Sequence, residues 1–210
     1  KELAQNYGVA IDMPAGPSEV LIIADENAVP EFCAADLLSQ AEHGSDSQVI
    51  FISTDAKILE ETIEETQKQL ENLPRNEFAR QSISNSHFIL MKSLDEALEF
   101  SNLYAPEHLI LAITDFEKYI PAIENAGSVF LGNYSCESAG DYASGTNHTL
   151  PTNGFAKNYS GVSLDSFVKK ITFQNLSKEG IQNLGNTIEV MAEAEGLFAH
   201  KNAVSIRLKN

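Results

Sequence analysis

Several side chains that could transfer protons or bind a metal lie near the ends of predicted helices and strands. Gln40 and His43 are three residues apart at the end of a predicted helix, so they project from one face. A helical histidine is more often a surface or capping residue than a metal ligand, and that alternative stays open for His43. His200 could likewise interact only with a helix C-terminus.

Glu107 and His108 are adjacent and follow Pro106 at a predicted junction between a helix and a strand. A carboxylate and an imidazole in this arrangement could supply two proton-transfer groups that point in different directions. Taken alone, the pair fits a solvated surface equally well.

The stretch from Gly132 to Pro151 shows neither helix nor strand periodicity, which is unusual inside a compact domain and typical of function or disorder. It gathers Glu137, Asp141 and His148 among glycines and serines that allow tight turns. We interpret it as a binding loop, although Asp141 alone fits a turn residue. Cys136 has no histidine nearby in the sequence to activate it, so a buried thiol is expected rather than a nucleophile.

Five apolar runs, which we interpret as strands, would hold these residues in place. They are nearly continuous rather than alternating, which is typical of parallel strands covered on both faces. The runs are Val20–Ala24, Val49–Ile52, Phe88–Met91, Leu109–Ile113 and Ser128–Leu131. Helical patterns separate them, so the chain is expected to form an α/β fold, a layered and mostly parallel sheet with right-handed crossovers.

The helices have readable ends. Pro30 fits the first turn of a helix that runs to about His43. Capping boxes at 93–96 and 114–117 predict the starts of a third and a fourth helix. After about Ser160 the alternation stops: residues 166–174 (SFVKKITFQ) predict a short edge strand, and the rest predicts a C-terminal helical arm.

Composition excludes several classes of protein. The chain has 210 residues, 43% of them hydrophobic, and a net charge of −16, which argues against nucleic acid as a partner. It contains no apolar run long enough for a membrane span, no signal peptide and no phosphate-binding glycine motif. Two cysteines fit a reducing compartment, so we expect a cytoplasmic protein. Because the first residue is Lys1, the chain is expected to be a piece of a longer protein.

Five motifs together resemble the histidinol dehydrogenase family, and the match runs along essentially the whole chain. They are AGPSEVLIIAD at 15–25, SQAEHG at 39–44, YAPEHL at 104–109, ESAGDYASGTNHTLPT at 137–152 and EGLFAHKNAVSIRL at 195–208. The resemblance covers only the second half of that enzyme. It implies that the first half, with the domain that binds NAD, is absent.

The resemblance also implies a domain plan. Residues 1–17 would be a remnant of the preceding NAD-binding domain, and residues 18–162 the second part of an incomplete Rossmann-like catalytic domain. Residues 163–210 would be a mainly helical dimerisation arm that completes the active site of the partner in a homodimer.

The family oxidises L-histidinol to L-histidine in two NAD-linked steps, the last of histidine biosynthesis. By resemblance, the zinc ligands are Gln40, His43, Asp141 and His200, and the proton acceptors are Glu107 and His108. The implied substrate-binding residues are Ser18, Gln40, His43, His108, Asp141, His148, Glu195 and His200. No NAD-binding residue is expected in this chain, which alone is expected to be inactive. The alternative is a non-redox zinc-binding module or a metal-dependent hydrolase, in which Glu107 activates a water.

The implied residues share one edge of the predicted sheet. Ser18, the Gln40/His43 pair and the Glu107/His108 pair all precede strands, so parallel strands place them at the amino edge, opposite the edge where such sheets usually bind ligands. The stretch after Gly132 leaves the carboxyl edge if its strand is parallel. Nine residues separate Gly132 from Asp141 and reach roughly 30 Å, enough to double back along a strand of about 17 Å. An antiparallel last strand is the alternative.

Overall fold

The computed structural model describes residues 1–14, 16–74 and 76–209, so Ala15, the first residue of the AGPSEVLIIAD motif, lies outside the described residues. The chain divides into two compact units, Lys1–Phe167 and Val168–Asn210. None of the helices in the described ranges has the length and apolar character needed to cross a membrane.

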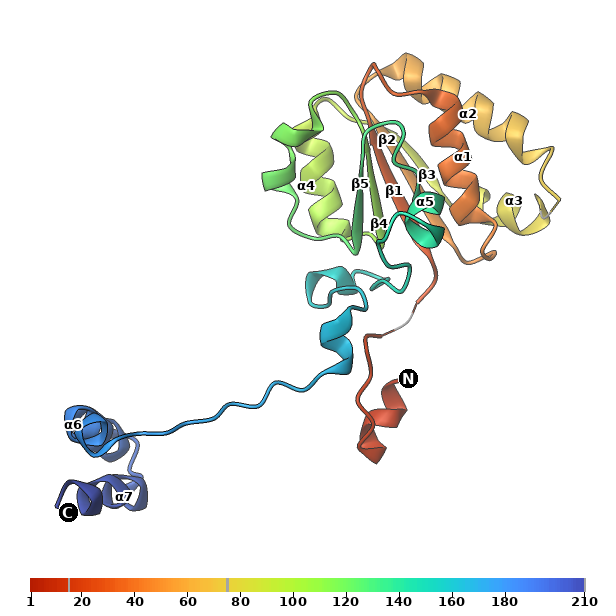
Figure 1. Cartoon of the computed structure of the whole chain (residues 1–210). Helices are drawn as coiled ribbons and strands as arrows, with labels where there is room; N and C mark the ends of the chain where they lie inside the picture. Colours follow the sequence, from red (N-terminus) through yellow and green to blue (C-terminus); the bar gives the residue numbers. More distant parts are fainter. Residues whose placement is uncertain (15, 75, 210) are drawn as a thin grey trace. The chain divides into compact units, whose positions relative to one another are not determined.

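The first unit is built on a five-stranded parallel sheet, which confirms the predicted α/β fold (Figure 1). Its strands are β1 (Glu19–Ala24), β2 (Gln48–Ser53), β3 (His87–Leu90), β4 (His108–Ala112) and β5 (Ser128–Leu131). They are ordered β3-β2-β1-β4-β5. Strands β2 and β3 are therefore added on one side of β1, and β4 and β5 on its other side. Since β5 is parallel to β4, the antiparallel alternative for the last strand is excluded.

Helices cover both faces of this sheet. Successive side chains of a strand point to opposite faces, so the apolar strands have buried side chains on both. Val20 and Ile22 of β1 belong to the core on one face, and Leu21 and Ile23 to the core on the other. The first face is covered by α1 (Pro30–Ala41), α2 (Ala56–Leu70) and α3 (Asn76–Ser84). The second face is covered by α4 (Leu94–Tyr104). Burial on both faces explains why the strands read as continuous apolar runs.

The capping signals predict one helix correctly and one wrongly. Ser93 caps α4 by accepting a hydrogen bond from the Glu96 main-chain N–H. The signal at 114–117 opens no α-helix, only the short 3₁₀ turns η2 (Phe116–Lys118) and η3 (Ile120–Ala122). Asp115, which would be the first helical residue after Thr114, lies in the left-handed region with φ 53°, so a right-handed helix cannot begin there. The Thr114 N–H instead donates to Asp25 Oδ2 at 2.6 Å.

The stretch predicted to be a binding loop contains one short helix, α5 (Glu137–Tyr142). Figure 1 shows α5 beside the end of α1, so the chain does double back from the carboxyl edge after β5. At the end of this stretch the Asn153 N–H donates to Glu19 Oε1 at 2.8 Å. The unit also contains three further 3₁₀ turns: η1 (Glu2–Tyr7), η4 (Phe155–Lys157) and η5 (Leu164–Phe167).

The second unit consists of α6 (Lys178–Ala194) and α7 (Phe198–Leu208), as the predicted helical arm requires. Gly185 lies against Leu208, so the absence of a Cβ lets the two helices approach closely. The predicted edge strand at 166–174 is wrong: residues 168–174 form no regular structure and pair with none of the described strands. An alternating pattern becomes a strand only when a neighbour supplies hydrogen-bond partners.

Candidate functional site

The main chain of Glu19, the first residue of β1, contacts both predicted proton acceptors. Its N–H donates to Glu107 Oε2 at 2.9 Å, and its carbonyl oxygen lies 3.0 Å from His108 Nδ1. A carbonyl oxygen only accepts, so Nδ1 carries the proton of the neutral ring and Nε2 is left with a free lone pair. Burial lowers the pKa of His108, which favours this neutral form.

His108 Nε2 is the atom that the ring presents to the site. It is buried, it has no hydrogen-bond partner among the described residues, and it lies 3.9 Å from Asp141 Oδ1. A buried nitrogen acceptor without a partner is costly unless a ligand supplies a proton or a hydrogen bond. The ring is therefore arranged to accept a proton on Nε2.

Glu107 is a buried carboxyl group that could act as a second base beside His108. Burial, together with the negative charges of Glu19 and Asp141, raises its pKa to about 8, against the opposing effect of the hydrogen bond from the Glu19 N–H. A base whose pKa lies near neutrality is well matched to general base catalysis. Glu107 Oε2 also lies 3.6 Å from His108 Nδ1, so the two buried side chains are neighbours.

Glu107 also lines a small hollow of about 200 Å³, together with Ser18 and His148. These three residues come from the amino end of β1, the amino end of β4 and the stretch after α5. The hollow therefore lies at the amino edge, where the sequence places the predicted substrate residues.

A second group of side chains joins α1 to α5. Glu137 is 2% exposed and Gln40 is 1% exposed. In the orientation that satisfies both side chains, the Gln40 amide nitrogen donates to Glu137 Oε1 at 2.7 Å and to Oε2 at 2.9 Å. Burial raises the pKa of Glu137 to about 9, with further contributions from the charges of Asp141, Asp36 and Glu107.

Among the described residues, His43, Glu137 and Asp141 form a cluster that could hold a metal ion, with ligand atoms within 4.8 Å of one another. His43 and Asp141 are predicted ligands, and Gln40, a third, is hydrogen-bonded to Glu137. An imidazole nitrogen and a carboxylate oxygen are ligands that suit zinc, and an amide oxygen is an uncommon addition to such a set. The structure thus brings three of the four predicted ligands to one place.

Glu19 contacts Glu107 and His108, and Glu137 contacts Gln40. Neither Glu19 nor Glu137 was assigned a role from the sequence. The spacing of Glu137 and Asp141, four residues apart, is a signal for one helix face that could have been used. Glu19 gives no such signal, because it acts on Glu107 and His108 through its main chain. Cys136, expected to be buried, is only half-buried and lies at the N-cap of α5.

The two remaining predicted residues belong to the second unit. Glu195 is the C-cap residue of α6, and His200 lies in the first turn of α7. Their part in a substrate or metal site stays a prediction.

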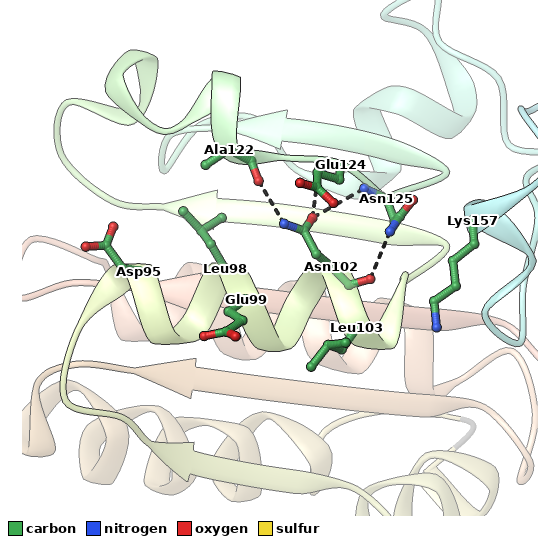
Figure 2. Close-up of a pocket in the computed structure, with 9 residues that line it drawn as sticks. All are labelled: Asp95, Leu98, Glu99, Asn102, Leu103, Ala122, Glu124, Asn125 and Lys157. Atoms are coloured by element: carbon green, nitrogen blue, oxygen red, sulfur yellow. Dashed lines mark hydrogen bonds between the residues drawn. The ribbon is translucent and has the colours of Figure 1, made fainter.

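Another hollow, of about 420 Å³, lies along α4 and holds none of the predicted site residues. Figure 2 shows Asn102 hydrogen-bonded to the turn formed by Ala122, Glu124 and Asn125, with Lys157 at the rim. Its acidic residues are Asp95, Glu99 and Glu124. Its lining includes no histidine or cysteine, so it offers no alternative site for proton transfer by an imidazole or a thiol.

Comparison with known proteins gives a consistent result. The sequence model of a family described as histidinol dehydrogenase matches residues 1–208. The chain is 59% identical over 209 residues to a histidinol dehydrogenase of Bacteroides fragilis, covering 100% of this chain and 49% of that protein. It is 59% identical over 206 residues to a chloroplastic one of Arabidopsis thaliana, covering 96% of this chain and 44% of that protein.

A solved structure is also similar. The crystal structure of a histidinol dehydrogenase from Elizabethkingia anophelis matches with a TM-score of 0.97 and 68% identity, over 100% of this chain and 48% of that one. The chain therefore spans about half the length of the relatives it matches.

Proposed function

This chain belongs to the histidinol dehydrogenase family, and we propose that it supplies the substrate and metal side of an enzyme that oxidises L-histidinol to L-histidine. The observation that carries the proposal is the unpartnered, buried His108 Nε2 beside Asp141. An alcohol oxidation requires a base at the hydroxyl group, and this nitrogen is the one buried imidazole acceptor that the site offers among the described residues.

In the first oxidation, His108 Nε2 accepts the proton of the substrate hydroxyl group. The Glu19 carbonyl keeps the ring in the tautomer that can do so, because it holds the Nδ1 proton at 3.0 Å. In the second oxidation, Glu107 accepts a proton from the water that adds to the aldehyde. NAD, bound by the part of the protein outside this chain, supplies the oxidant for both steps.

Zinc is the metal that the donor set fits. Gln40, His43 and Asp141 would hold it in this unit, and the fourth ligand, His200, would come from the second unit of a partner subunit. When bound, zinc supplies a positive charge that fixes the substrate nitrogens in place. Ser18 and His148 line the hollow next to Glu107, which supports a role for both in orienting the substrate. Glu195 would pair with the substrate ammonium group.

The test compares this chain with the full-length protein that contains it. With zinc and L-histidinol, the full-length protein is expected to form NADH and the chain alone is not, because no predicted NAD-binding residue lies in residues 1–210. NADH absorbance measures the reaction, and hydrolysis of amide substrates is assayed in parallel. Amide hydrolysis without NADH formation by the full-length protein would overturn the proposal in favour of a metal-dependent hydrolase.

A further inference from the structure

Two residues on one face of α1 contact a single residue of α5. Asp36 and Gln40 are one helical turn apart, so their side chains lie on the same face. An interaction with the main chain of Glu137 opposes the rise in the pKa of Asp36 that burial causes, and the Gln40 amide nitrogen donates to both carboxylate oxygens of Glu137. α1 therefore meets both the backbone and the side chain of Glu137.

This contact is deeply buried. Asp36, Gln40 and Glu137 are 9%, 1% and 2% exposed. A buried carboxylate or amide is destabilising unless its hydrogen bonds are made, so these partners are held together strongly once the fold forms. The α1–α5 contact is thus specified by polar groups, with little freedom to slide.

The contact also decides which atom of Gln40 is available. An amide side chain has a donor end and an acceptor end. The nitrogen donates to Glu137 when that carboxyl group is ionised, the form that a positive metal ion nearby favours, and the oxygen is then the end turned away from it. The oxygen is the end that can bind a metal, since an amide nitrogen has no free lone pair for one.

We propose that Glu137 is a positioning residue that orients Gln40 for metal binding and sets Asp141, one turn further along α5, beside His43. The inference rests on the zinc site proposed above. Partners that orient the ligands of a metal are nearly as important as the ligands, and their loss typically costs about 10- to 100-fold in affinity. In this arrangement Glu137 acts through Gln40 and does not itself bind the metal.

The test is a double-mutant cycle in the full-length protein, with cobalt and zinc affinities measured by competition with a chelator. Gln40→Ala and Glu137→Ala are each expected to weaken binding by about 10- to 100-fold. The double variant is expected to bind no more weakly than the weaker single variant, because both changes remove the same interaction. Ser138→Ala, an exposed change next to Glu137, is the control and is expected to have no effect.

The cobalt absorption spectrum gives a second readout. At saturating cobalt, the Glu137→Ala spectrum is expected to match that of Gln40→Ala, since both lack the same oxygen ligand. Losses that multiply in the double variant would show an independent role for Glu137, such as direct ligation, and would overturn the inference. Unchanged affinity and spectrum in Glu137→Ala would overturn it as well. Wild-type protein that binds neither metal would overturn the zinc site itself, which separates the two failures.

An exchange of the two groups covers the case in which Glu137→Ala fails to fold. Gln40→Glu alone places two buried carboxylates together and is expected to weaken metal binding and stability. Adding Glu137→Gln again places an amide donor opposite a carboxylate acceptor. The double variant is therefore expected to bind metal more tightly and to be more stable than Gln40→Glu alone. A double variant that is no better than Gln40→Glu would contradict the proposed pairing.

Discussion

The amide and the carbonyl group of Glu19 hold Glu107 and His108 at the same time, although these two side chains are neighbours in sequence. This leaves the second carboxylate oxygen of Glu107 and Nε2 of His108 without a bond to Glu19. This separation permits two proton transfers of different kinds in one pocket. It also means that a substitution at position 19 leaves the orienting main-chain groups in place.

At this scale the first prediction concerns Glu107→Gln in the full-length protein. Oxidation of histidinol to the aldehyde is expected to persist, because His108 serves that step. Oxidation of the aldehyde is expected to slow by about 10²- to 10⁴-fold, the usual effect of losing a general base. Single-turnover measurements started from the alcohol and from the aldehyde separate the steps. Equal losses in both would refute this division of roles.

A second prediction at the residue scale links Glu107 to the pH dependence of stability. The pKa of this group rises from 4.5 to about 8 on folding, so between these values the folded state holds a proton that the unfolded state has released. The free energy of unfolding therefore falls as pH rises through this window, by up to about 1.4 kcal/mol per pH unit for such a group. Glu107→Gln removes this contribution and is expected to flatten the slope.

Urea unfolding of the chelator-treated full-length protein at several pH values checks this expectation. Glu64→Gln, a change at an exposed position of α2, is the matched control and is expected to keep the wild-type slope. The same wild-type slope in Glu107→Gln would show that this carboxylate is not protonated in the fold.

At the scale of elements, Gly127, which precedes β5, packs closely against the main chain of Glu107, which precedes β4. A Cβ at Gly127 would lie 2.5 Å from the main-chain oxygen of Glu107 and 3.1 Å from Leu150 Cβ. Backbone atoms cannot rotate away, so Gly127→Ala is expected to lower the free energy of unfolding by about 1–3 kcal/mol and to displace Glu107. Thermal unfolding and the activity of the folded fraction measure the two effects.

Gly44→Ala is the control for that change. Its Cβ would lie 2.8 Å from Asp46 Oδ1 and 4.0 Å from Ser47 Oγ, and the exposed Asp46 side chain can move away. Little loss of stability is expected. If both substitutions have the same effect, close approach to the Glu107 backbone is not the cause.

The elements that could be predicted from sequence are those with strong local signals. Buried parallel strands read as apolar runs, and Ser93 marks the start of α4. The fourth helix and the edge strand were wrong because their local signals lacked tertiary support: Thr114 bonds to Asp25, and residues 168–174 have no described strand as a neighbour. α3, a helix of nine residues, was not predicted.

For the site, motif residues could be predicted and the residues that orient them could not. The amino-edge placement of Ser18 and Glu107 follows from their position before strands, and the structure has them lining one hollow. The contacts of Glu19 span 88 residues to Glu107 and 134 residues to Asn153, and no local pattern encodes such distances. The pairing of Gln40 with Glu137 is of the same kind.

At the scale of the whole molecule, the prediction is that two subunits share each site. His43 lies in the first unit and His200 in the second, and the second unit exposes apolar side chains such as Phe198 and Met191. Mixing His43→Ala with His200→Ala subunits of the full-length protein is expected to restore one intact site per mixed dimer, because one subunit contributes each missing ligand.

Recovered NADH formation, with mixing verified by two different affinity tags, measures this outcome. Each variant alone serves as the inactive control. Verified mixed dimers without recovery would place His200 in the site of its own subunit.

The long sequence separations around Glu19 have a consequence for how the chain folds. A contact between residues 88 positions apart must first close a large loop, and the entropy lost in closing it is repaid only when β1 and β4 pair side by side. The Asn153 contact, across 134 positions, closes a still larger loop. The orientation of the two predicted proton acceptors therefore depends on the pairing of β1 with β4, and no short segment of the chain contains it.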